Sequence, residues 1–229
     1  MRHRPGRRVD PRQELAFTNQ NVMDLVEALV ATPDLRLVKV AAKLSLARGI
    51  PDEADLAGLV GLSLYFDDDL GATAREVARL ALAIGSHPDG EVRPRLRGAL
   101  LERLTHRLVE QRAPANTHHE RDVELLRAPR SRRSWTNTKE VVVDLPGWEV
   151  YECKSDGLPV ISDIDELSDI VTTGREEGVT VFSTVVVFGD EATLRSMARA
   201  WRLTEPIYAV TTTNLLDLRR HRPTVALRA

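Results

Sequence analysis

Residues 141–154, VVVDLPGWEVYECK, decide the fold of the second half of this chain. Two runs of β-favouring side chains, 141–143 and 150–153, flank the turn-forming pair Pro146-Gly147, and this pattern predicts an antiparallel hairpin. Side chains alternate between the two faces of a strand. We therefore expect Glu152 and Lys154 on one face of the sheet and Cys153 on the other.

The length of the turn decides whether Asp144 joins that face. A two-residue turn would pair Asp144 with Glu149, which has the opposite parity to Glu152. A three-residue turn, Pro146 to Trp148, would pair Asp144 with Val150 and align it with Glu152 and Lys154. We predict three residues or a bulge, with the carboxylates of Asp144 and Glu152 within reach of one metal ion.

The segments around the hairpin predict a mixed sheet flanked by helices. After it, the pattern favours a helix at 163–177, a strand at 179–188, a helix at 191–202 and a strand at 206–212. Before it, Thr117-His118-His119-Glu120 fits a capping box, which predicts a helix to about Leu126. The expected order is αββαβαβ.

The first half of the chain shows a different period. Apolar residues recur at helical spacing from Gln13 to about Arg112, with breaks near 32–34, 48–51, 67–71 and 86–90 that indicate about five helices. Asp67-Asp68-Asp69 is interpreted as a loop or helix cap. A short linker at 113–116 separates the halves, so the predicted class is α+β, with an all-helical domain at 1–112 and a second domain at 117–229.

Composition narrows the possible functions. The net charge of −2 argues against coating nucleic acid by overall charge and leaves only local patches. The one cysteine, Cys153, excludes an internal disulfide and a cysteine-based zinc site. No apolar run approaches the roughly 18 residues of a membrane span, and the N-terminus lacks the apolar stretch of a signal peptide, so we expect a cytoplasmic protein with no membrane partner.

Two acids and a lysine on one sheet face suit metal-dependent cleavage of a phosphodiester, because carboxylates hold a hard divalent ion that activates water. The sequence resembles the PD-(D/E)xK nuclease superfamily, in its Mrr-type restriction endonuclease and Holliday-junction-resolvase branch. The resemblance rests on Asp144, which is followed after seven residues by Glu152-Cys153-Lys154 and then by an αβαβ order. The similarity covers roughly residues 115 to 220. Val143 stands where the family name has proline, and no glutamine of the family pattern follows Lys154.

The resemblance implies the site residues. Asp144, Glu152 and the main-chain carbonyl of Cys153 would bind Mg²⁺ or Mn²⁺, and Lys154 would orient or activate the attacking water. Members of the family often add an acid from the helix before the hairpin, for which Glu120 and Glu124 are the candidates. Nucleic-acid contacts are expected from the arginines that precede the hairpin, Arg127, Arg130, Arg132 and Arg133.

The predicted function is a DNA endonuclease whose helical domain recognises a partner, a target or a regulatory state. Cleavage of both strands would imply a homodimer, and RNA remains open as a substrate because the same chemistry serves either backbone. The alternative is a catalytically inactive PD-(D/E)xK-like module that binds nucleic acid or a partner protein in a defence or repair assembly.

Overall fold

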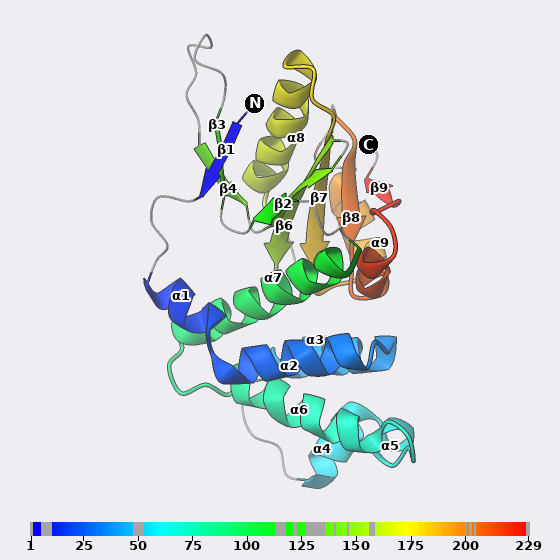
Figure 1. Cartoon of the computed structure of the whole chain (residues 1–229). Coiled ribbons are helices and arrows are strands. Elements are labelled where there is room, and N and C mark those ends of the chain that lie inside the picture. Colours follow the sequence, from blue (N-terminus) through cyan, green and yellow to red (C-terminus); the bar gives the residue numbers. More distant parts are fainter. Residues whose placement is uncertain are drawn as a thin grey trace. The chain divides into compact units, whose positions relative to one another are not determined.

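The computed structural model describes the backbone of residues 2–5, 11–47, 53–112, 118–120, 123–126, 136–139, 141–145, 147–155, 159–199, 201, 203 and 205–227. Side chains are described for 14–47, 55–112, 147–155, 159–199, 201, 203 and 205–227. The fold is mixed α+β (Figure 1). It divides into two compact units, Asp10–Arg107 and Met1–Val9 with Leu108–Ala229.

The first unit, Asp10–Arg107, is helical throughout its described residues. Its helices are α1 (Pro11–Phe17), α2 (Gln20–Ala31), α3 (Leu35–Leu44), α4 (Glu53–Val60), α5 (Leu62–Tyr65), α6 (Gly71–Gly85) and α7 (Val92–Arg112), the last of which continues into the second unit. The predicted breaks at 32–34, 67–71 and 86–90 are confirmed, whereas the predicted break at 48–51 and the predicted linker at 113–116 lie outside the described residues. Two breaks were not predicted, one between α1 and α2 and one at Gly61, where φ is +96°.

Local capping explains where these helices start. The side chain of Asn19 accepts hydrogen bonds from Asn21 N and Val22 N, and that of Asp34 accepts from Arg36 N. Asp67 Oδ1 accepts from the main-chain N–H groups of Asp69 and Leu70. The interpretation of the Asp67-Asp68-Asp69 run as a loop is therefore confirmed, whereas the residue that caps α6 is Leu70, which makes no side-chain cap hydrogen bond.

The second unit is built on a six-stranded mixed sheet, ordered β2-β5-β6-β7-β8-β9 (Figure 1). The strands are β2 (His118–Glu120), β5 (Val141–Leu145), β6 (Gly147–Lys154), β7 (Val181–Val187), β8 (Ile207–Val210) and β9 (Ala226–Leu227). β2, β5 and β6 form antiparallel neighbours, whereas β6, β7 and β8 run parallel. The predicted hairpin, and the predicted strands that became β7 and β8, are confirmed.

Two helices cover one face of this sheet. Helices α8 (Ile161–Glu176) and α9 (Glu191–Ala198) supply the crossovers that parallel strands require. The core contains Trp148 and Val150 from β6 together with Ile164, Leu167 and Ile170 from α8. Even-numbered positions of β6 therefore face α8, and this face is the one that carries Glu152 and Lys154.

The helix predicted at 117–126 is wrong. Residues 118–120 form β2, which pairs with β5, and Val123–Leu126 forms β3, which lies between β1 (Arg2–Pro5) and β4 (Thr136–Lys139) in a separate three-stranded sheet. The capping-box pattern is local and weak, whereas strand pairing supplies main-chain hydrogen bonds along the whole segment. Pairing with distant strands therefore overrides the helical signal.

The predicted three-residue turn is also wrong, although the parity argument behind it holds. Asp144 pairs with Trp148, and Leu145 pairs with Gly147, so the register differs by two residues from the expected pairing with Val150. Gly147 has φ +119°, and a Cβ there would lie 2.8 Å from the carbonyl oxygen of Thr180. Any other residue fits this turn poorly, because its Cβ would be strained by the positive φ and would also clash with the Thr180 carbonyl oxygen.

Candidate functional site

The ammonium of Lys154 forms the centre of the candidate site, at the carboxyl end of β6. Its Nζ lies 2.9 Å from Glu152 Oε1, a contact that the shared parity of the two positions permits. The Glu152 side chain is 6% exposed and the Lys154 side chain 27% exposed. The carboxylate is thus nearly enclosed, while the ammonium still reaches solvent.

Asp163 supplies a second carboxylate to the same ammonium. Its Oδ1 lies 3.1 Å from Lys154 Nζ, and its Oδ2 accepts a hydrogen bond of 2.9 Å from the main-chain N–H of Val160 at the start of α8. The first turn of α8 therefore fixes Asp163 beside β6. The sequence analysis placed Asp163 at the start of a predicted helix but did not assign it to the site.

Lys154 remains protonated in this environment. Burial alone would lower the pKa of its ammonium, but the charges and hydrogen bonds of Glu152 and Asp163 outweigh burial and raise the pKa above its ordinary value. Lys154 in this state is a positive charge and a hydrogen-bond donor.

Position 144 has the strand parity that was predicted for it but not the predicted position along the strand. Its register partner, Trp148, has the same parity as Glu152. Trp148 is nonetheless four residues from Glu152, which at about 3.3 Å per residue is about 13 Å along the strand. Two carboxylates on one Mg²⁺ need oxygens no more than about 4 Å apart, given metal–oxygen distances near 2.1 Å. This register does not favour one ion shared by Asp144 and Glu152.

The other predicted residues are distributed as follows. Glu120 lies on β2 opposite Val142, which pairs with Val150, so position 120 has the parity of Glu152. Glu124 lies on β3 in the other sheet, so the expectation that both acids belong to one helix before the hairpin is wrong. The arginine cluster lies outside the described residues, at Arg127, Arg130, Arg132 and Arg133.

The opposite face of β6 carries a buried ionic cluster. Glu149, 1% exposed, accepts hydrogen bonds from both terminal nitrogens of Arg112, from Arg222 Nε and from the Tyr151 hydroxyl at 2.6 Å. Burial alone would raise the pKa of Glu149, but the donors, Arg112 first, hold the pKa below its ordinary value. Arg112 also donates from Nε to the carbonyl of Leu218. The cluster joins the end of α7, β6 and the C-terminal segment, which is a structural role.

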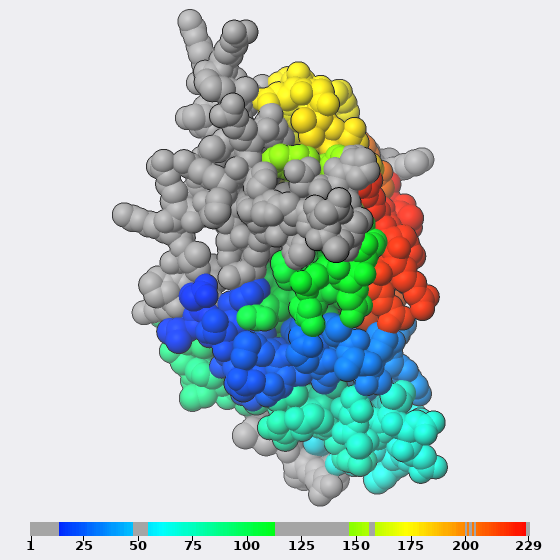
Figure 2. Space-filling view, viewed as in Figure 1, coloured from blue at the N-terminus to red at the C-terminus, as the bar shows by residue number. Residues whose placement is uncertain are grey.

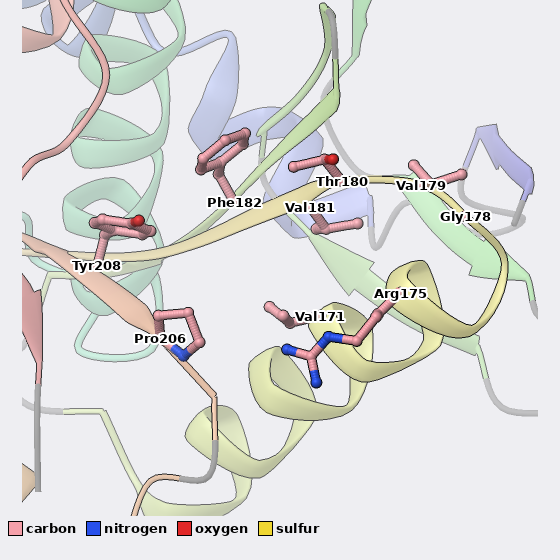
Figure 3. A pocket seen from close by; sticks show the side chains of 9 residues that line it. All are labelled: Val171, Arg175, Gly178, Val179, Thr180, Val181, Phe182, Pro206 and Tyr208. Carbon is pink, nitrogen blue, oxygen red and sulfur yellow. The ribbon is translucent and has the colours of Figure 1, made fainter.

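A cavity of about 450 Å³ lies at the other end of β7 (Figure 3). Arg175 and Val171 of α8, Phe182 of β7 and Tyr208 of β8 contribute to its walls. Arg175 is engaged by Glu205 through two hydrogen bonds. Trp148, at the start of β6, pairs with Val181, whereas Lys154 pairs with Val187, so the cavity is about 20 Å along the strand from Lys154. It is separate from the candidate site.

Comparison with known protein families, with curated proteins and with solved structures found no match to this chain. Among the side chains that the structure describes, no three His, Cys, Asp or Glu residues converge as metal ligands; the side chains of Asp144, Glu120 and Glu124 are not among those described. Within the described helices, none combines the length and apolarity needed to cross a bilayer.

Proposed function

We propose that this chain is a divalent-metal-dependent endonuclease of the PD-(D/E)xK type that hydrolyses phosphodiester bonds of DNA. The observation that carries the proposal is the position of the Lys154 ammonium, between the carboxylates of Glu152 and Asp163 and on the face of β6 that the motif requires. Two acids beside one lysine are the groups that the chemistry needs.

The order of elements supports the same proposal. An antiparallel β2-β5-β6 arrangement is followed by α8, the parallel strand β7, α9 and the parallel strand β8. This is the hairpin followed by αβαβ that the resemblance implies, with a strand in place of the helix expected directly before the hairpin. The motif residues thus lie on a rigid central strand of a mixed sheet, where catalytic side chains hold their positions well.

The donor set fits Mg²⁺ or Mn²⁺, since carboxylate and carbonyl oxygens are the ligands that these hard ions prefer. Glu152 and the Cys153 carbonyl would be two ligands. Asp163 would be the second carboxylate in place of Asp144, because its oxygen and that of Glu152 both contact one nitrogen, at 3.1 and 2.9 Å. When bound, the ion would act as a Lewis acid and lower the pKa of bound water.

Lys154 and Asp163 have distinct parts in this proposal. The Lys154 ammonium donates to the scissile phosphate or to the attacking water and offsets the negative charge that develops on the phosphate oxygens. Asp163, anchored by the Val160 N–H, holds that ammonium in place.

Cleavage of supercoiled plasmid in Mg²⁺ or Mn²⁺, alongside duplex DNA and RNA oligonucleotides, tests the proposal. Lys154→Ala should leave metal binding, followed by calorimetric titration with Mn²⁺, largely intact and reduce single-turnover cleavage by about 10²-fold or more. Lys154→Arg should rescue poorly, because a planar guanidinium does not reproduce a compact ammonium. Wild-type cleavage rates in Lys154→Ala would overturn the assignment of the site.

Two further variants decide which residue is the second carboxylate. Asp163→Asn should weaken Mn²⁺ binding and cleavage together, whereas Asp144→Asn should retain both. The matched control is Asp165→Asn, which changes an exposed acid on the same helix and should cleave at the wild-type rate. Loss of metal binding in Asp144→Asn, with Asp163→Asn unaffected, would return the role to Asp144.

The second candidate function is an inactive PD-(D/E)xK-like module that binds nucleic acid. The offset of Asp144 from Glu152 by four residues favours it, because such a module keeps the fold and loses the shared metal site. It predicts oligonucleotide binding that does not depend on metal, with no cleavage under any of the conditions above. Metal-dependent cleavage that is lost in Lys154→Ala would exclude it.

A further inference from the structure

A groove of about 260 Å³ lies in the helical unit, between α3 and the α4–α5 segment. We call it the α3 groove. Figure 2 shows α3, in light blue, reaching the surface beside the cyan atoms of the following helices. Its walls include Val40 from α3 together with Leu59 and Leu64 from α4 and α5. Val40 and Leu64 are each 5% exposed, so the apolar floor is set into the unit.

Three cations line the α3 side of this groove. Arg36, Lys39 and Lys43 have spacings of three and four residues, which places them along one side of the helix. Arg36 is already paired with Asp34, and Lys43 Nζ donates to the Leu59 carbonyl at 3.3 Å. Among the described residues, Lys39 has no acidic partner. Two of the four lysines in the chain thus lie beside one apolar groove, and no described acid pairs with either of them.

Large apolar side chains are exposed on the chain segments that lie next to the groove. Leu46, just beyond α3, is 42% exposed, Leu62 of α5 is 63% exposed, and Phe66, just beyond α5, is 70% exposed. Exposed apolar groups that gather beside polar ones are typical of surfaces that bind other proteins. A nucleic-acid backbone would use the cations, but it would leave the apolar floor and these side chains uncovered.

We propose that the α3 groove binds an acidic amphipathic helix of a partner protein. Apolar side chains at helical spacing would enter between α3 and α4–α5, and flanking Asp or Glu side chains would face Lys39 and Lys43, as in other helix-in-groove complexes. Helix α3 has ten residues and is therefore about 15 Å long, enough for two to three turns of a bound helix. This inference does not depend on nuclease activity.

Fluorescence anisotropy with two labelled peptides tests the proposal on the full chain. The first probe is a helical peptide of about 16 residues with Leu at helical spacing and Glu on both sides, and the second has Gln in place of every Glu. We expect the Glu peptide to bind saturably and about tenfold more tightly than the Gln peptide, with the difference lost at high salt because the charges are screened. Equal binding of the two peptides, or none, would overturn the proposal.

Variants locate the binding surface. Lys39→Glu should weaken binding of the Glu peptide about tenfold by charge repulsion, and Leu59→Ser should weaken both peptides. Arg79→Glu is the matched control, since Arg79 is an exposed cation on α6 outside the groove, and it should bind as wild type does. If Lys39→Glu binds the Glu peptide normally, or if it instead weakens binding of a duplex oligonucleotide, the groove is not a site for an acidic helix.

Discussion

Replacement of Glu149 by Gln should destabilise the sheet unit strongly. The change keeps the shape of the side chain but removes its charge, which leaves the Arg112 guanidinium, with a side chain 11% exposed, without an anion in a buried setting. Breaking a buried ion pair costs about 3–5 kcal/mol. Gln retains a carbonyl that can still accept hydrogen bonds, and the Arg222 side chain is 30% exposed. We therefore expect the lower end of that range, about 3 kcal/mol.

Urea unfolding followed by tryptophan fluorescence measures this change in the correct unit. All three tryptophans, Trp135, Trp148 and Trp201, belong to the sheet unit, so the signal does not report the helical unit. With a slope of about 2 kcal/mol per molar urea, the midpoint should fall by about 1.5 M. Glu191→Gln is the control, because its pair with Arg195 is exposed, and it should cost about 0.5 kcal/mol or less. A Glu149→Gln midpoint within about 0.3 M of the wild type would show that the buried pair of Glu149 and Arg112 contributes little to stability.

Three further predictions concern the same molecule. Because the pKa of Glu149 is lowered in the folded state, the stabilisation that Glu149 provides should be fully present above its ordinary pKa of 4.5 and should be lost as the pH falls through the lower folded value. The urea midpoints of wild type and Glu149→Gln, measured from pH 6 downward, should therefore converge, and parallel curves would contradict this. In thermal unfolding, Gly174→Ala should destabilise the protein by about 1–3 kcal/mol, since a Cβ there would lie 2.3 Å from Val181 Cγ2. Gly58→Ala, with open space around its Cβ, should instead stabilise the protein by about 0.5–1 kcal/mol, and equal effects of the two substitutions would argue against the packing of α8 on β7. The thiol of Cys153, buried at 6% exposure, should react with a thiol reagent only as fast as the sheet unit opens, and rapid labelling of the native protein would show that the side chain is accessible.

Short-range patterns account for the elements that were predicted correctly. The stripe Val22, Leu25, Val26 and Leu29 is buried on α2 as its spacing indicates, because a helix brings positions three and four apart to one side. The hairpin and the later alternation of helices and strands follow equally from local period and from Pro-Gly punctuation. Glu152 and Lys154 share a face for the same reason.

Pairing over long distances decided the elements that were missed. Residues 118–126 carry a capping pattern that favours a helix, yet they form β2 and β3 because β5 and the distant β1 offer hydrogen-bonding edges. No local signal in 118–126 indicates those partners. The same holds for the hairpin register, which the carbonyl of Thr180 constrains at Gly147 from more than thirty residues away.

Local sequence patterns were sufficient to predict the α+β class, the shared sheet face of Glu152 and Lys154 and the strand parity of Asp144. Alternation along a strand is a property of the backbone and needs no knowledge of the rest of the chain. The second acid beside Lys154, in addition to Glu152, could be identified only from the folded chain. The packing of α8 on β6 brings Asp163 to 3.1 Å from the ammonium, while the register of β5 leaves Asp144 opposite Trp148. Proximity between separate elements depends on how their apolar faces pack, and spacing in the sequence does not encode it.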